Sequence, residues 1–265
     1  MALFPQLNAR GLIVQRPYTR SFSALTTSEE QSSGRRYARS WRANPLATYT
    51  CTYSSLTDAE YGVLSAFFDA RKGRYEAFAW IDPAGNLARY SEDFAQSAWV
   101  KSGVTVGAAV ADPFGGTRAT SVTGASGAAY MQIDLEPTAI NGRVLCASAW
   151  LRSASGGNTV SVGFLDGSNF YREVVLAAGV WTRVEYTRTI TDAGTVSMLI
   201  GIGAGVVQVF GAQVAATPGA GAYARSPAQY GYRPNCRFGA DTISAKINGP
   251  NSNAVGFTIE EFYSA

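Results

Sequence analysis

Histidine is absent from this chain of 265 residues, and only 15% of the residues are charged. The absence of histidine excludes a Ser-His-Asp or Cys-His catalytic relay, metal sites with histidine ligands, and a histidine-based pH switch. Any catalysis would have to use carboxylates, tyrosine, lysine or a lone thiol. The hydrophobic fraction of 46% is that of a folded protein, so a disordered or fibrous chain is also excluded.

Cysteine is scarce as well, and Cys51, Cys146 and Cys236 are far apart in the sequence. None belongs to a C-x-x-C pair, which excludes a zinc ribbon or a dithiol redox motif and predicts three buried free thiols. The N-terminal sequence lacks the basic and then apolar pattern of a signal peptide. The apolar run 198–216 contains four glycines, so we expect two strands around a Gly-rich turn and no membrane insertion.

The net charge of +3 is too small to indicate a bulk nucleic-acid binder. Its distribution is more informative, because the excess of basic residues lies in the first third of the chain. Seven arginines lie between residues 10 and 42, and Glu29 and Glu30 are the only acidic residues among them. This set, the Arg stripe, consists of Arg10, Arg16, Arg20, Arg35, Arg36, Arg39 and Arg42.

Apolar and polar residues alternate in several short runs, and this period of two predicts half-buried antiparallel strands. The clearest runs are 160–164, 196–200, 243–247 and 255–259. A turn is expected at 248–250, between the last two runs, because the sequence there is Asn-Gly-Pro. The chain is therefore expected to be mainly β.

One helix is expected, over residues about 57–72. Thr57 and Glu60 have the spacing of a capping box, in which each side chain bonds the backbone amide of the other residue. Gly73 suits the left-handed position that ends many helices. A strand is expected directly afterwards, over residues 75–81.

The composition changes near residues 82–85 and changes back near residue 229. The last segment, 230–265, is too short to form a core by itself, so we expect it to complete the sheet begun by residues 1–85. Residues 86–229 then form an inserted β-sandwich. Such an insertion is tolerated when its two ends lie close together on the surface of the host domain.

The two outer segments together resemble the distal tail protein family of long-tailed phages and gene transfer agents. The most specific match is the run Phe67-Phe68-Asp69-Ala70-Arg71-Lys72-Gly73-Arg74, which is followed by Phe78-Ala79-Trp80-Ile81-Asp82. Phe4-Pro5 and the late run Cys236-Arg237-Phe238-Gly239-Ala240-Asp241 also match. The resemblance implies a split, tail-tube-like β-sandwich domain with one helix.

The same resemblance implies a structural protein of the virion, without an active site, cofactor or metal. Six copies would close a ring at the end of the tail tube and join the tube to the hub or tail-tip proteins. The protein would be made in the host cytoplasm and would end up at the tail tip. On this reading the Arg stripe is a candidate ring interface, because arginine pairs well with carboxylates. A lumen near passing DNA and a solvated strand face that prevents aggregation remain open alternatives.

The middle segment resembles the jelly-roll carbohydrate-binding-like modules of phage tail and fibre proteins. The matching residues include the opening run 86–94, Trp99, Trp150 and Trp181, and we expect these tryptophans in the core. The resemblance implies a module that projects outward and either contacts host surface polysaccharide or braces neighbouring subunits. The candidate glycan-contact residues combine aromatic rings with polar groups, and they are Tyr130, Gln132, Asp166, Phe170, Tyr171 and Arg172. Phe170 and Tyr171 are adjacent, so only one of them can face a ligand.

Two other functions remain open for the same residues. A receptor-binding or glycan-binding tail fibre or baseplate component is the main alternative. A tail-associated polysaccharide depolymerase would need two carboxylates across a cleft, and Asp134 and Glu136 on one strand do not provide them. No Asp-rich loop supports calcium binding at Asp93, Asp134 or Glu136. The run Gly201-x-Gly203-x-Gly205 lacks the helix and lysine of a nucleotide site.

Overall fold

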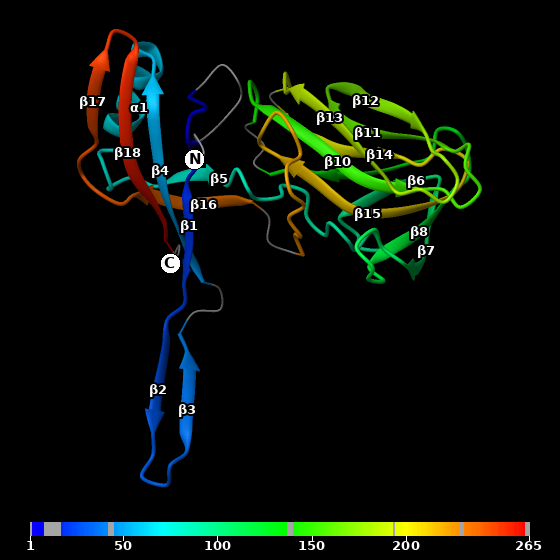
Figure 1. The fold of residues 1–265 in the computed structure, drawn as a ribbon, viewed down its shortest axis with the longest axis horizontal. Helices are drawn as coiled ribbons and strands as arrows, with labels where there is room; N and C mark the ends of the chain where they lie inside the picture. Colours follow the sequence, from blue (N-terminus) through cyan, green and yellow to red (C-terminus); the bar gives the residue numbers. More distant parts are fainter. Residues whose placement is uncertain are drawn as a thin grey trace. The chain divides into compact units, whose positions relative to one another are not determined.

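The fold is described from a computed structural model, for residues 2–7, 17–41, 45–136, 140–192, 194–227 and 231–262. These residues are mainly β, with one α-helix, as predicted (Figure 1). The chain divides into two compact units. The described residues up to Trp80 belong to the first unit, which resumes at Arg233, and the second unit spans Ile81–Tyr232. The expected insertion, 86–229, falls within the second unit.

The first unit is built on a six-stranded sheet with the order β1-β4-β18-β16-β5, to which β17 is added by pairing with β18. Its strands are β1 (Thr19–Ser23), β4 (Leu46–Leu56), β5 (Phe78–Ile81), β16 (Tyr232–Phe238), β17 (Ser244–Gly249) and β18 (Ser252–Glu261). β18, from the end of the chain, pairs with β4 and β16, so the C-terminal segment completes the sheet begun by the N-terminal one.

Aromatic side chains fill the core of the first unit, and Phe4 lies at its centre. The Phe4 ring is 5.0 Å from that of Trp80 and 5.6 Å from that of Phe67 between centroids. It also contacts Phe78, Phe238 and Phe257. The N-terminal segment is held there by the backbone, because Phe4 N donates to the carbonyl of Ala79. Phe4 is only 1% exposed, so residues 2–7 are part of the core rather than a tail.

Helix α1 (Asp58–Ala70) confirms the expected helix and its capping box. Thr57 Oγ1 accepts from Glu60 N, while Thr57 N donates to Glu60 Oε2 at 2.9 Å. The expected strand 75–81 begins later, at Phe78. The reason is a turn after the helix in which Lys72 and Gly73 both have left-handed φ values, 51° and 62°, which delays the extended backbone.

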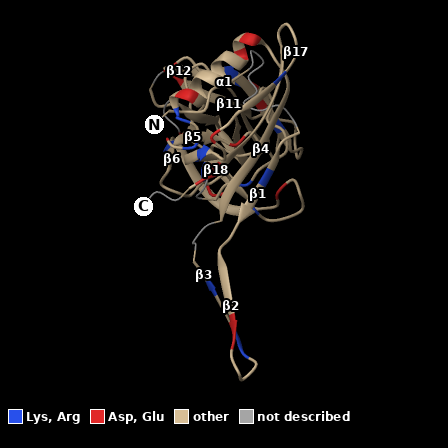
Figure 2. Ribbon diagram, turned by 90° about the vertical axis from the view of Figure 1, so that its left-hand side faces the viewer, with Lys and Arg blue, Asp and Glu red and all other residues tan. Residues whose placement is uncertain are grey.

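A two-stranded ribbon, β2 (Thr26–Glu30) and β3 (Arg36–Ser40), forms a sheet of its own. A turn joins the two strands, and in it Gly34 N donates to the carbonyl of Gln31. Every residue from 19 to 41 is exposed, so no other described element packs on the ribbon. Both signs of charge occur on it (Figure 2). We call residues 26–41 the hairpin arm.

The second unit is a sandwich of two five-stranded antiparallel sheets. One sheet has the order β13-β10-β15-β8-β7, and the other has the order β12-β11-β14-β9-β6. The strands are β6 (Trp99–Ser102), β7 (Val104–Val110), β8 (Ala119–Gly124), β9 (Tyr130–Asp134), β10 (Val144–Arg152), β11 (Thr159–Asp166), β12 (Ser168–Val175), β13 (Thr182–Thr189), β14 (Ser197–Gly201) and β15 (Gly205–Ala215). Because the chain crosses repeatedly from one sheet to the other, the topology is that of a jelly roll.

The chain enters and leaves the second unit at one place. Asp82 N donates to the carbonyl of Gly231 at 2.7 Å, and Gly231 N donates to the carbonyl of Asn86 at 2.8 Å. Asn86 is buried and its amide bonds the carbonyls of Ala212 and Ala224. The ends of the unit therefore lie side by side, which is the geometry that an inserted domain requires.

Several expectations about single residues have clear outcomes. The three cysteines are free and buried, as predicted. Trp99 is fully buried, whereas Trp150 and Trp181 are half-buried. The prediction that Ile247 faces a core was wrong: it is 76% exposed, because β17 pairs only with β18 at the margin of the sheet. Within the described residues, no helix is long and apolar enough to cross a membrane.

Candidate functional site

The candidate site lies on the outer face of the sheet β12-β11-β14-β9-β6. The strand register places Tyr171 of β12 opposite Gly163 of β11, and Gly163 opposite Leu199 of β14. Leu199 in turn lies opposite Gln132 of β9. The residues on either side of Gly163 on β11, Val162 and Phe164, are buried in the sandwich core. Since side chains alternate along a strand, the row from Tyr171 to Gln132 faces outward.

A second row on the same face lies two residues further along each strand. It runs from Glu173 of β12 through Ser161 of β11 and Gly201 of β14 to Tyr130 of β9. Glu173 is exposed, and Tyr130 is half-buried. The two rows together bring a tyrosine and a polar group to each side of the sheet face, with the two central strands between them.

Glycine keeps the middle of this face hollow. A Cβ at Gly163 would meet the carbonyl oxygen of Phe170 and the backbone of Tyr171, and a Cβ at Gly201 would meet the hydroxyl of Ser161. Neither glycine projects a side chain over the sheet. We call the hollow over Gly163, Ser161 and Gly201, bounded by β12 on one side and by β9 on the other, the trough.

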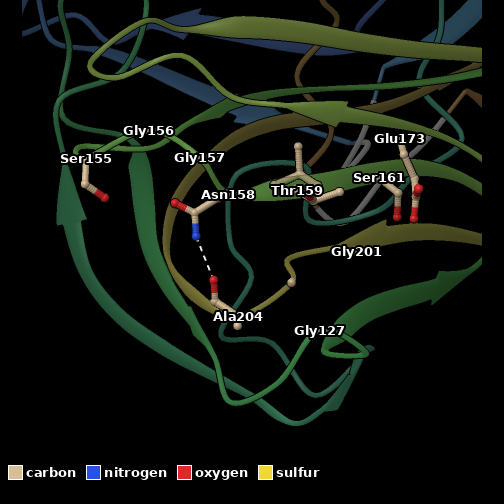
Figure 3. Close-up of a pocket in the computed structure, with 12 residues that line it drawn as sticks. Gly127, Ser155, Gly156, Gly157, Asn158, Thr159, Ser161, Glu173, Gly201 and Ala204 are labelled. Atoms are coloured by element: carbon tan, nitrogen blue, oxygen red, sulfur yellow. Dashed lines mark hydrogen bonds between the residues drawn. The ribbon is translucent and has the colours of Figure 1, made fainter.

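A pocket of about 500 Å³ opens at one end of the trough (Figure 3). The side chains of Glu173 and Ser161 point to the same side in this view. The far wall is a loop that Asn158 anchors, because its Nδ2 donates to the carbonyl of Ala204 at 2.7 Å and its Oδ1 accepts from Ser153. Gly156 and Gly157, with φ values of 76° and 78°, allow this loop to turn back. The pocket is thus lined by short polar side chains and exposed backbone.

The structure brings three of the six candidate glycan-contact residues to this face: Tyr130, Gln132 and Tyr171. Tyr171 is 43% exposed, as a stacking ring must be. Phe170 and Arg172 face the other way, because they lie opposite Phe164 and Val162. Phe170 and Tyr171 therefore lie on opposite sides of β12, as expected for neighbours on a strand, and Tyr171 is the one on the trough.

Asp166 does not reach the trough. Its carboxylate is buried and accepts from Arg188 Nε at 2.7 Å, from Asp192 N at 2.6 Å and from Thr191 N. Burial opposes ionisation, but these hydrogen bonds outweigh it and hold the pKa of Asp166 below its ordinary value. The Arg188 guanidinium also lies 3.2 Å from the centre of the Phe170 ring. Asp166 therefore holds the sandwich together instead of contacting a ligand.

Ser161, Glu173 and Asn158 line the site but were not among the residues singled out from the sequence. No sequence motif marks them, because their proximity depends on which strands are neighbours and in which register. The alternation of Thr159 and Ser161 with valines on β11 is the signal that the sequence offers for a polar outer face.

The Arg stripe is only partly described, since Arg10, Arg16 and Arg42 lie outside the described residues. Arg20 is on β1, and Arg35, Arg36 and Arg39 are on the hairpin arm, where all are exposed. Arg36 forms an ion pair with Glu30 at 3.0 Å. Arg39 lies 4.1 Å from the centre of the Trp41 ring, and Trp41 Nε1 donates to Thr27 Oγ1. These contacts stay within the ribbon and hold its exposed aromatic and arginine side chains in place.

In the described part of the chain, no group of three or more Cys, Asp or Glu side chains lies within reach of one metal ion. Asp134, one of the residues considered for calcium, accepts a hydrogen bond from Ser197 Oγ at 2.6 Å.

No protein-family model matches this chain, and no curated protein sequence matches it either. Solved structures with similar folds include the enzymatically active domain of tailspike protein 4 of bacteriophage CBA120. That match has 14% identity and a TM-score of 0.37, and it covers 51% of this chain but only 22% of the tailspike chain. The tandem CBM22 domains of Paenibacillus barcinonensis Xyn10C match with 14% identity and a TM-score of 0.41, over 67% of this chain and 61% of that one. The C-terminal family 22 carbohydrate-binding module of Clostridium thermocellum Xyn10B matches with 17% identity and a TM-score of 0.40, over 52% and 98%.

Proposed function

We propose that this chain is a structural subunit of a phage tail and that its inserted sandwich contacts host surface polysaccharide through the trough. The observation that carries the proposal is the trough itself: a hollow over Gly163, Gly201 and the short side chain of Ser161, flanked by Tyr171 on β12 and Tyr130 on β9. Binding sites for small ligands are concave and combine apolar surface with a few placed polar groups. An aromatic ring offers a flat surface for the C–H face of a pyranose, and Gln132 and Glu173 offer partners for its hydroxyls.

The hairpin arm supports the assembly role of the first unit. A two-stranded ribbon by itself is at best marginally stable in water, and its open edges invite pairing with another chain. Trp41 and Tyr37, each 55% exposed, stand on it beside Arg39. Tryptophan, tyrosine and arginine are the residue types that dominate protein–protein interfaces. We propose that the arm is buried against further copies of the chain in a closed ring at the tail tip, which is hexameric as in the family that the sequence resembles.

We propose a non-catalytic role for the trough. Its outer face carries two carboxylates, Glu173 on β12 and Asp134 on β9. The two strands are three strand spacings apart, roughly 14 Å. Glycosidases hold their two carboxylates within about 5–10 Å of each other. This separation favours binding over hydrolysis, and release of reducing ends from a bound polysaccharide would contradict the proposal.

The proposal is tested on the full chain with two reciprocal variants. Light scattering and negative-stain electron microscopy are expected to find a ring for the wild type and smaller species for the double variant Tyr37→Ala, Trp41→Ala. Tyr171→Ala is expected to keep the ring and to lose retention in polysaccharide affinity gels. Each variant is the control for the other, since the double variant should keep its binding per chain. A wild-type monomer with no ring would overturn the assembly role, and retention unaffected by Tyr171→Ala would overturn the role of the trough.

A glycan-binding fibre or baseplate component is the second candidate. It predicts strong Tyr171-dependent binding together with an assembly that is not a closed ring, so the same images and gels separate the two candidates.

A further inference from the structure

The charge of the trough differs in sign from that of the chain. The chain has a net charge of +3. Yet the outward positions of β6, β9, β11, β12 and β14, taken from the register, contain Glu173 and Asp134 and no lysine or arginine. A ligand on this face therefore meets a negative surface on a positive protein.

The neighbouring basic residues are turned away or already engaged. Arg172 is on the opposite side of β12, opposite the buried Val162. Lys101 Nζ donates to the carbonyls of Gln96 and Trp99, both at 2.8 Å. Arg188 is paired with Asp166. None of these three side chains is available to neutralise a charge that a ligand brings onto the trough.

The two carboxylates of this face, Asp134 and Glu173, differ in whether they already accept a hydrogen bond within the protein. Asp134 accepts from Ser197 Oγ, which orients it along the sheet. Glu173 lines the pocket beside Ser161 and forms no hydrogen bond or ion pair in the described part of the chain. An ionised carboxylate accepts strong hydrogen bonds from hydroxyls and stronger ones from ammonium groups, whereas it repels other anions.

We infer that the trough selects polysaccharides by charge, with Glu173 as the selecting residue: it binds amine-bearing sugars best and neutral sugars next, and it rejects acidic ones. This inference rests on the proposed function, because it specifies the ligand class of the same site. The predicted order of preference is opposite to the one that the net charge of the chain would give. A positively charged protein attracts acidic polymers most strongly when binding is non-specific.

The test compares three immobilised polysaccharides at physiological salt. They are chitosan, which bears amines, a neutral β-glucan, and alginate, which is acidic. The full chain is measured as wild type, Tyr171→Ala, Glu173→Gln and Glu29→Gln. Glu29→Gln is the matched control, because it removes one carboxylate from the hairpin arm and changes the net charge by the same amount. Only binding that Tyr171→Ala abolishes is counted, which removes attachment through the exposed arginines.

We expect Tyr171-dependent binding in the order chitosan, β-glucan, alginate. Glu173→Gln should weaken chitosan binding roughly tenfold, which corresponds to one charge-assisted hydrogen bond, while Glu29→Gln leaves it unchanged. Tyr171-dependent binding of alginate that equals or exceeds that of chitosan would overturn the charge selection and leave the glycan proposal intact. An unchanged preference in Glu173→Gln would also overturn it. Absence of Tyr171-dependent binding to any of the three would overturn the proposed function as well.

Discussion

Gly163 lies directly opposite Tyr171 in the ladder between β11 and β12, and the backbone of β12 leaves no room there for a β-carbon. The pair explains how a tyrosine can stand over a sheet with an open surface beside it. At Gly163 the hollow is therefore fixed by the backbone of β12.

The two glycines of the trough should respond differently to alanine. At Gly163 the new methyl group would meet backbone atoms of Phe170 and Tyr171, so Gly163→Ala should destabilise the sandwich by about 1–3 kcal/mol. At Gly201 it would meet only the Ser161 hydroxyl, which can rotate. Gly201→Ala should keep the stability and weaken polysaccharide binding by filling the trough. Hydrogen exchange of the β11–β12 peptides and affinity gels measure the two effects, and equal loss of protection in both variants would contradict this distinction.

The buried carboxylate of Asp166 should make the sandwich sensitive to acid. Its folded pKa is below the unfolded value of about 3.9, so its contribution to stability is present above that value and is lost as pH falls through the folded pKa. Asp166→Asn should lower the free energy of unfolding by about 1.5–3 kcal/mol at pH 7, and by less below the folded pKa. Thermal unfolding across pH measures this. Glu185→Gln is the control, because the Glu185 side chain is 41% exposed, and an equal effect of both variants would contradict the prediction.

Residues 2–7 should contribute to the stability of the first unit mainly through the ring of Phe4. Phe4→Ala removes a fully buried side chain from the centre of an aromatic core and should destabilise the first unit by about 3–5 kcal/mol. Phe22→Ala is the matched control, since Phe22 on β1 is 49% exposed. Urea unfolding followed by hydrogen exchange of β4 and β18 measures the difference. A loss of less than 1 kcal/mol, roughly the scale of a surface substitution, would mean that the segment is not part of the core.

The three thiols should be unreactive in the folded protein. Each cysteine is buried, and burial raises the pKa of Cys146 and Cys236 above the ordinary value. The thiolate is the reactive form, so a thiol reagent at mildly alkaline pH should modify none of the three cysteines in the native state and all of them in guanidinium chloride. Rapid labelling of Cys51 in the native state would indicate that the β4–β18 pair opens readily, because Cys51 lies opposite Phe257 there.

Local features of the fold followed from local sequence. Thr57 and Glu60 define the start of α1 because the capping box needs only residues three apart, and the alternation at 160–164 gives a strand because burial on one face needs only a period of two. The trough did not follow from the sequence. Which of Phe170 and Tyr171 faces outward depends on the partner strand, and the closeness of Glu173 to Ser161 depends on the register between β11 and β12.

Two further features have the same origin. The two strands expected in the run 198–216 are present as β14 and β15, but the run itself does not indicate that they belong to different sheets and that the chain crosses between the sheets at the glycines. Ile247 follows the pattern of a core strand yet is exposed, because nothing in its own sequence tells whether a second layer covers it. Alternation identifies a strand, whereas the neighbours of that strand decide what its faces touch.

The order in which the strands of the first unit occur along the chain has a consequence for biosynthesis. β18 forms the middle of the first unit's sheet, between β4 and β16, although it is made last. While the ribosome is still making the rest of the chain, β4 therefore lacks its partner strand β18. The continuous segment Ile81–Tyr232 can fold as soon as it emerges. During this interval β4 exposes Tyr49, Cys51 and Tyr53, which are all buried in the finished protein. The newly made chain is thus most exposed to misassembly just before its last strand is complete, and chaperone binding should concentrate on that stage.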